Sequence, residues 1–216
     1  MAERKLYCLS GLGADKKAFQ YLSIENVELI HIEWIDPLPK ETLQSYAERL
    51  FTQHIDETQD YLIMGLSFGG MLAQEFAKIK SPERLFLIST ISSGSKLPFY
   101  LRVAGSLKVH RLLPDRLIKS TNFITRYLFG TQDEKVEVIF KQIQKDSDPK
   151  YIRWAIGAIL TWRNDQPHQG VHIHGSKDRL LPLKEKAQFV VKDGGHLMLI
   201  DHADKVSSIL NEQINK

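Results

Sequence analysis

The sequence predicts an α/β fold in three layers, with helices covering both faces of a mostly parallel sheet of about six strands. Short apolar runs of strand length alternate with segments whose apolar residues recur every three or four positions, which is the pattern of βαβ units. The chain has 216 residues, of which 43% are hydrophobic and 25% are charged. This size and composition are typical of one globular domain, so we assign residues 1–216 to a single domain.

Six apolar runs are the candidate strands of this sheet. They lie at residues 5–9, 27–32, 61–64, 85–88, 171–174 and 189–191. Helical spacing of apolar residues follows at 43–55 and at 68–79. A closing helix is predicted near the C-terminal end, with one apolar face made by Val206, Ile209, Leu210 and Ile214.

The stretch from Ile91 to Arg163 interrupts the alternation of strands and helices. It contains no convincing strand, and its helical patterns are punctuated by Pro98, Pro114 and Pro149. Ser147-Asp148-Pro149 is typical of a helix start, with a capping side chain and a proline in the first turn. Because the stretch is too long for a loop, residues 91–163 are predicted to form a helical lid over one edge of the sheet.

The pentapeptide Gly65-Leu66-Ser67-Phe68-Gly69 matches the pattern G-x-S-x-G. It follows a buried strand and opens an amphipathic helix, which is the setting of a nucleophile elbow. Such a turn holds a serine hydroxyl in the open, but it forces a strained backbone on the serine. Side chains two residues before and after would collide, so Gly65 and Gly69 are expected to be required. Ser67 is therefore the candidate nucleophile.

An acid and a base are expected later in the chain, in that order. Asp178 follows the strand at 171–174 within the segment His-Gly-Ser-Lys-Asp, whereas no carboxylate follows the strand at 85–88. His196 comes after two glycines in a late loop. We assign Asp178 as the acid that orients the base and His196 as the general base. The assignment of Asp178 is based mainly on its order in the chain and its position after a strand.

Two backbone N–H groups are needed to bind the oxyanion that develops during acyl transfer. The amide of Phe68, directly after the nucleophile, is the first candidate. The second is the amide of Leu12, in the glycine-rich loop Ser10-Gly11-Leu12-Gly13-Ala14 after the first strand.

These motifs together resemble the α/β-hydrolase superfamily over nearly the whole chain. The matching segments, in their expected order, are SGLG, GLSFGG, HGSKD with a following proline, and GGHLML. The resemblance implies an eight-stranded parent sheet with a helical lid after its sixth strand, and a serine esterase-like enzyme. The chain departs from that pattern by starting at the equivalent of the third strand, by having Ser10-Gly11 in place of His-Gly, and by the short spacing between Asp178 and His196.

A metal site is the alternative explanation for two of the eight histidines. His172 and His174 share a face of one strand and could chelate a metal, but no third ligand is evident. Buried, hydrogen-bonded structural roles are favoured for both. Cys8 is the single cysteine, which excludes an internal disulfide and a cysteine-based zinc site. We expect neither a metal nor a cofactor.

A serine nucleophile favours acyl chemistry on a small-molecule substrate. The leading hypothesis is a carboxylesterase-like hydrolase that acts on a small carboxylic ester, with a lactone or thioester as variants. Two alternatives stay open. The same triad could serve a carbon–carbon bond hydrolase or lyase, and the fold could serve a non-catalytic ligand-binding module.

Charge and hydropathy constrain the partners. The net charge of +3 is too small to indicate nucleic-acid binding, and no apolar run is long enough to span a membrane. We expect a cytoplasmic monomer or homodimer. Between Ile91 and Gly130 there are seven basic residues and one acidic residue. A solvated helix face is the favoured explanation, and attraction of an anionic substrate or acidic surface is the alternative.

Overall fold

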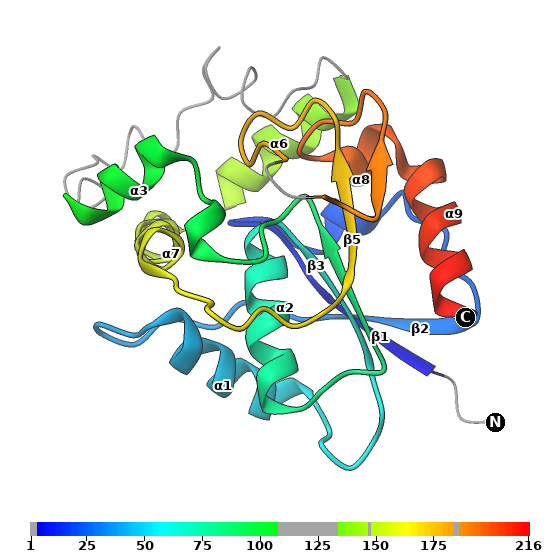
Figure 1. Cartoon of the computed structure of the whole chain (residues 1–216), viewed down its shortest axis with the longest axis horizontal. Helices are drawn as coiled ribbons and strands as arrows, with labels where there is room; N and C mark the ends of the chain where they lie inside the picture. Colours follow the sequence, from blue (N-terminus) through cyan, green and yellow to red (C-terminus); the bar gives the residue numbers. More distant parts are fainter. Residues whose placement is uncertain (1–3, 108–133, 147, 184–185) are drawn as a thin grey trace.

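A computed structural model of the protein describes residues 4–107, 134–146, 148–183 and 186–216. Six parallel strands form one sheet in the order β2-β1-β3-β4-β5-β6 (Figure 1). The strands are β1 (Arg4–Leu9), β2 (Val27–His31), β3 (Leu62–Leu66), β4 (Arg84–Ile88), β5 (Val171–Gly175) and β6 (Phe189–Val191). The predicted fold class is confirmed, and every predicted strand lies within two residues of its expected bounds.

The helices also follow the predicted pattern. The α-helices are α1 (Leu43–His54), α2 (Phe68–Ile79), α3 (Phe99–Ser106), α6 (Glu134–Asp146), α7 (Pro149–Thr161), α8 (Met198–Asp201) and α9 (Ala203–Ile214). The 3-10 helices are η1 (Lys16–Phe19) and η2 (Gly94–Lys96). None of the helices in the described part of the chain is long and apolar enough to cross a membrane.

Strand side chains alternate between two apolar cores, one on each face of the sheet. In β1, Tyr7 and Leu9 belong to the core that α1 and α2 cover. Leu6 and Cys8 belong to the core that contains η1, α8 and α9. Figure 1 shows α1 and α2 on one side of the sheet and α9 on the other. Burial on both faces explains why the strands are almost continuously apolar.

The strand order places two loops side by side at one end of the sheet. β1 pairs with β2 on one side and with β3 on the other, so the order reverses at this point. The register matches Leu9, the last residue of β1, with Gly65 near the end of β3. The loops that follow β1 and β3 therefore start next to each other, at the place where open α/β sheets bind ligands.

Where the structure describes the segment 91–163, it contains the helices η2, α3, α6 and α7 and no strand. Asp148 caps α7, and its side chain accepts a hydrogen bond from the Lys150 amide, which confirms the predicted helix start. α7 contributes to the core on the α1 and α2 side, whereas Val136 and Ile139 of α6 join the opposite core. Pro114, Ser147 and six of the charged residues between Ile91 and Gly130 lie outside the described residues. These six are Lys108, Arg111, Asp115, Arg116, Lys119 and Arg126.

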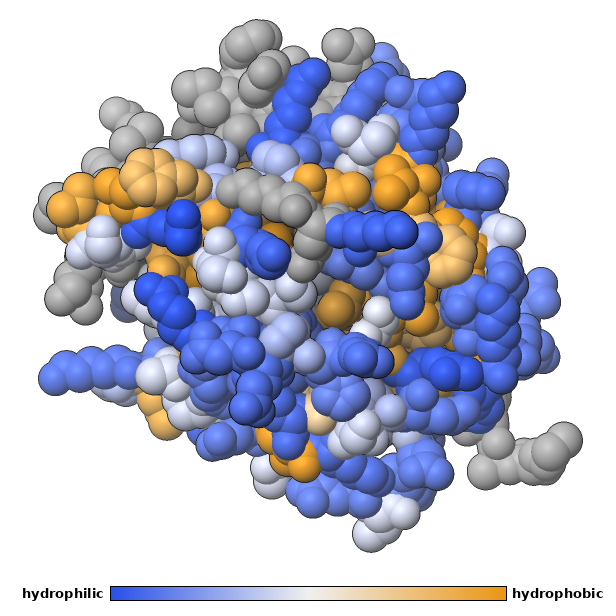
Figure 2. Space-filling model, viewed as in Figure 1, coloured by the Kyte–Doolittle hydropathy of each residue, from blue (hydrophilic) through white to orange (hydrophobic). Residues whose placement is uncertain are grey.

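Helix α3 packs against α7 through a glycine and exposes Phe99, Tyr100 and Val103, whereas its Leu101 is partly buried against the core. A Cβ at Gly105 would lie 2.9 Å from Leu160 Cβ, so the two helices approach closely at this point. Figure 2 shows apolar side chains gathered over α3, where Phe99 and Leu107 are the most exposed. The segment thus joins the core on the α1 and α2 side through α7 and Leu101 of α3, and the opposite core through α6.

Candidate active site

Ser67 lies in a sharp turn between β3 and α2. Its backbone has φ 53° and ψ −115°, a strained conformation for a residue with a side chain. A Cβ at Gly65 would overlap the Gly69 carbonyl, and a Cβ at Gly69 would overlap the Leu9 carbonyl. A side chain at either glycine would therefore collide with backbone. The contact with Leu9 also holds the turn against the end of β1.

Neighbouring groups stabilise this strained turn. The Ser67 amide donates to the carbonyl of Ile88, at the end of β4, over 2.8 Å. The Ser67 carbonyl accepts from the amides of Gly70 and Met71 and from Thr90 Oγ1, the last over 2.7 Å. The conformation of Ser67 is thus held by its own helix and by the adjacent strand.

The structure brings Ser67, Asp178 and His196 together. His196 Nε2 lies 2.8 Å from Ser67 Oγ, and His196 Nδ1 lies 2.7 Å from Asp178 Oδ2. These side chains come from the turns after β3 and β5 and from the loop after β6. Asp178 is 5% exposed and His196 is 2% exposed, while Ser67 is partly exposed. Ser67 is therefore partly open to solvent, whereas the two side chains behind it are shielded from water.

The carboxyl group of Asp178 is held in its ionised form. Burial is the largest influence and would raise its pKa. The charge interaction with His196, hydrogen bonds from His174 and His196, and the Leu181 amide oppose this influence. Together they hold the pKa of Asp178 well below its usual range. An ionised Asp178 can accept the hydrogen of His196 Nδ1 and so direct Nε2 towards Ser67.

The loops that carry Asp178 and His196 are joined through their backbones. A Cβ at Gly175 would overlap the carbonyl of Gly194, so the two loops touch at glycine positions. The Lys177 amide donates to the Gly194 carbonyl over 2.8 Å, and the Ser176 amide donates to the Val191 carbonyl over 3.0 Å. No helix intervenes in residues 179–183 or 186–188, the part described there, so the short spacing brings acid and histidine together directly.

The loop after β1 is closed at the Ala14 carbonyl. Ser10 Oγ donates to this oxygen over 2.6 Å and Trp34 Nε1 donates over 2.8 Å, while the Ala14 amide donates to the Gly11 carbonyl. A Cβ at Gly11 would lie 3.7 Å from Ser67 Cβ, so the loop borders the serine. Sequence reasoning did not single out Trp34, and no motif around it would have done so.

The two predicted oxyanion donors come from two segments near Ser67. Leu12 belongs to the loop that borders the serine, and Phe68 is the first residue of α2. The first amides of a helix have no acceptor within the helix, so the Phe68 amide is available to a ligand by its position. The role of the two amides stays a prediction.

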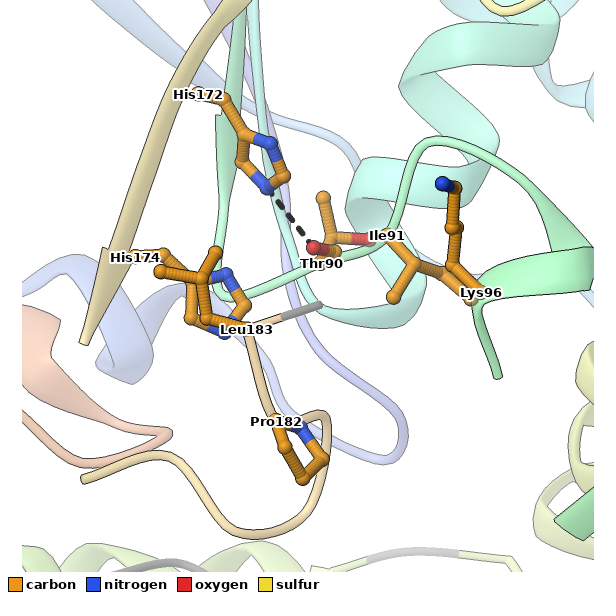
Figure 3. A pocket seen from close by; sticks show the side chains of 7 residues that line it. All are labelled: Thr90, Ile91, Lys96, His172, His174, Pro182 and Leu183. Carbon is orange, nitrogen blue, oxygen red and sulfur yellow. Dashed lines mark hydrogen bonds between the residues drawn. The ribbon is translucent and has the colours of Figure 1, made fainter. Parts of the chain in front are cut away.

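His172 and His174 are buried and hydrogen-bonded, as predicted (Figure 3). His172 Nε2 bonds to the Thr90 carbonyl over 2.9 Å, and His174 Nε2 bonds to the Leu181 carbonyl over 2.8 Å. Within the described ranges, no group of three His, Cys, Asp or Glu side chains is placed to hold a metal ion. Sequence reasoning missed that His174 Nε2 also lies 3.3 Å from Asp178 Oδ2.

Aromatic side chains connect the inserted segment to the residue after Ser67. The ring centroid of Phe68 lies 5.8 Å from that of Trp34 and 6.2 Å from that of Trp154, which is on α7. Tyr151, also on α7, lies 6.0 Å from Trp34. Helix α7 therefore packs beside the turn that carries Ser67.

No protein-family model matches the chain, and no curated protein matches its sequence. Its structure is similar to that of a thermophilic esterase from Thermogutta terrifontis (TM-score 0.74, 19% identity, 98% of this chain and 89% of that one). It is also similar to an esterase from Exiguobacterium antarcticum (TM-score 0.73, 15% identity, 99% of this chain and 92% of that one). A third similar structure is the enol-lactonase from Burkholderia xenovorans LB400 (TM-score 0.68, 15% identity, 100% of this chain and 93% of that one). The chain therefore has the α/β-hydrolase fold.

Proposed function

We propose that this chain, with its α/β-hydrolase fold, is a serine hydrolase that cleaves a small carboxylic ester, lactone or thioester. The observation that carries the proposal is the continuous line of short contacts from Ser67 Oγ through His196 to Asp178, at 2.8 and 2.7 Å. A serine hydroxyl becomes an effective nucleophile when an adjacent base removes its proton and a third group orients that base.

The reaction proceeds in two halves. His196 Nε2 takes the Ser67 proton as Oγ attacks the carbonyl carbon, and the oxyanion that forms faces the amides of Leu12 and Phe68. His196 then gives that proton to the leaving alcohol or thiol, which breaks the original bond and leaves an acyl-enzyme on Ser67. In the second half, His196 takes a proton from water, the resulting hydroxide attacks the acyl carbon, and the proton returns to Ser67 as the acid leaves.

Two further observations support an ester or lactone substrate and a lid. The similar structures include two esterases and an enol-lactonase, which supports an ester or lactone as the substrate. Helix α7 contacts Phe68 through Trp154, beside the proposed nucleophile. We extend the proposal to residues 91–163 as a helical lid whose described helix α7 borders the acyl site.

The proposal is tested by a panel of p-nitrophenyl esters and by labelling with a fluorophosphonate. Ser67→Ala should abolish ester turnover and labelling while the far-UV circular dichroism spectrum stays unchanged. Ser89→Ala is the matched control, because Ser89 also has positive φ after a parallel strand and is buried, yet the proposal gives it no role. Undiminished turnover in Ser67→Ala would contradict the assignment.

The same experiment separates the remaining alternatives. A chain that is labelled on Ser67 but turns over no ester would be assayed with β-diketones and cyanohydrins, substrates of carbon–carbon bond cleavage. A chain that is neither labelled nor active on any ester would be a binding module, and the proposal would be wrong.

A further inference from the structure

The carboxylate of Asp178 accepts hydrogen bonds at both of its oxygens. Oδ1 accepts from the amides of Leu180 and Leu181, at 3.0 and 2.9 Å. Oδ2 faces His196 Nδ1 at 2.7 Å and His174 Nε2 at 3.3 Å. Only the contact with His196 belongs to the line that leads to Ser67. The other donors are available to fix the carboxylate itself.

His174 is a donor in this arrangement. Its Nε2 lies between two oxygens, the Leu181 carbonyl at 2.8 Å and Asp178 Oδ2 at 3.3 Å. A carbonyl oxygen and an ionised carboxylate can only accept hydrogen bonds, so Nε2 carries the hydrogen and both oxygens share it. The side chain of His174 is 1% exposed. Water therefore does not compete for this hydrogen.

We propose that His174 is a positioning residue that holds the Asp178 carboxylate in line with His196, an inference that rests on the proposed serine hydrolase function. The amides on Oδ1 belong to the turn that carries Asp178, so they move with that turn. His174 instead belongs to β5, where it pairs with Val190 of β6. Its donor ties Oδ2 to the sheet, and without it the carboxylate rotates more freely about its Cβ–Cγ bond.

His172 provides a matched control on the same strand. It lies on the same face as His174, is also buried, and its ring centre is 5.6 Å from that of His174. Its Nε2 bonds to the carbonyl of Thr90, the contact drawn as a dashed line in Figure 3. Exchange of His172 therefore perturbs the packing of this face through a contact other than the one with Oδ2.

The test compares His174→Gln with His174→Asn in the full chain. The amide nitrogen of glutamine reaches the position of Nε2, whereas the shorter asparagine amide corresponds to Nδ1. We expect His174→Gln to keep kcat for a p-nitrophenyl ester within about threefold of wild type, and His174→Asn to lower it on the order of tenfold to hundredfold. KM should change little in both, because Asp178 acts on His196 and touches no substrate.

The corresponding pair at His172 shows the effect of exchanging a buried histidine on this face without removing the donor to Asp178 Oδ2. His172→Gln and His172→Asn should differ in kcat by less than the His174 pair, although both lower the melting temperature. Equal kcat values in His174→Gln and His174→Asn would overturn the inference. Turnover that persists in Ser67→Ala would instead overturn the proposed function, so the two failures are distinguishable.

A measurement on the wild-type protein needs no His174 variant to fold. In ¹⁵N-labelled protein, the imidazole of His174 should show its hydrogen on Nε2 at neutral pH, with the signals of His172 identified from His172→Gln. A hydrogen found on Nδ1 alone would overturn the inference, because Nε2 could not then donate to Asp178.

Discussion

Thr90 Oγ1 donates a 2.7 Å hydrogen bond to the carbonyl oxygen of Ser67. This bond joins the loop after β4 to a turn whose central residue has φ 53°. A residue held in that region costs about 1–3 kcal/mol and persists only where its surroundings determine it. Thr90 is one of the neighbouring residues that hold Ser67 in this conformation. Its methyl group also fills the space next to Gly70, where a Cβ would lie 2.5 Å from Thr90 Cγ2.

Thr90→Val should lower stability and activity together. Valine keeps the shape of the side chain but removes the donor to Ser67, a loss of about 1 kcal/mol in the free energy of unfolding. We expect kcat for a p-nitrophenyl ester to fall several-fold, because the turn that carries the serine becomes less well fixed. Thr90→Ser keeps the hydroxyl and is the control, and an equal loss of kcat in both variants would contradict the role of the bond.

Gly65→Ala should destabilise the fold strongly. Its Cβ would overlap the backbone of Gly69, and backbone cannot move aside as a flexible side chain can. We expect a loss of at least about 3 kcal/mol in the free energy of unfolding, measured by urea denaturation. Gly11→Ala is the matched control, since its Cβ would lie 3.7 Å from the nearest heavy atom, Ser67 Cβ, which is an ordinary van der Waals contact. Similar stability of the two variants would show that the turn relaxes.

Asp178 should make stability depend on acid pH. Its folded-state pKa lies below the value of about 3.9 in an unfolded chain. Its contribution is therefore complete above the unfolded pKa and is lost as pH falls through the folded pKa. We expect the stability difference between wild type and Asp178→Asn to be largest near pH 6 and to shrink below about pH 4, as measured by urea unfolding.

Asp193→Asn is the control for that experiment. The pKa of Asp193 is also lowered, first by a hydrogen bond from Lys177, but its carboxylate is exposed to water. Solvent screens such a pair, so this variant should show a smaller change with pH. A stability difference for Asp178→Asn that grows towards low pH would contradict a lowered folded-state pKa.

Ser10→Ala should weaken catalysis more than binding. The hydroxyl of Ser10 holds the Ala14 carbonyl and with it the loop that carries Leu12. An oxyanion donor acts mainly in the transition state, so kcat should fall about fivefold to fiftyfold while KM changes little. Ser95→Ala is the control, because Ser95 is exposed and its hydroxyl bonds to Ser93, away from this loop. Unchanged kcat in Ser10→Ala would mean that Trp34 alone holds the loop.

Much of the fold was predictable because its signals are local. The predicted helix at 68–79 coincides with α2, and the predicted strands were found because burial on two faces makes them apolar throughout. The need for glycine at Gly65 and Gly69 followed from the geometry of the turn itself. The packing of α6 and α7 into opposite cores was not predictable, because periodicity identifies an apolar face but not its partner.

In the candidate site, too, some features were predictable from the sequence and others were not. By itself the sequence determined that Ser67 lies in a local G-x-S-x-G motif and that Asp178 and His196 follow it in that order. Only the tertiary structure decided which neighbours fix these residues. His172 and His174 share one face because side chains alternate along a strand. Of these two, His174 is the one that the turn after β5 brings to 3.3 Å from Asp178 Oδ2, among the contacts described. Contacts of this kind depend on strand register and loop closure, which join residues far apart in the chain and leave no local pattern.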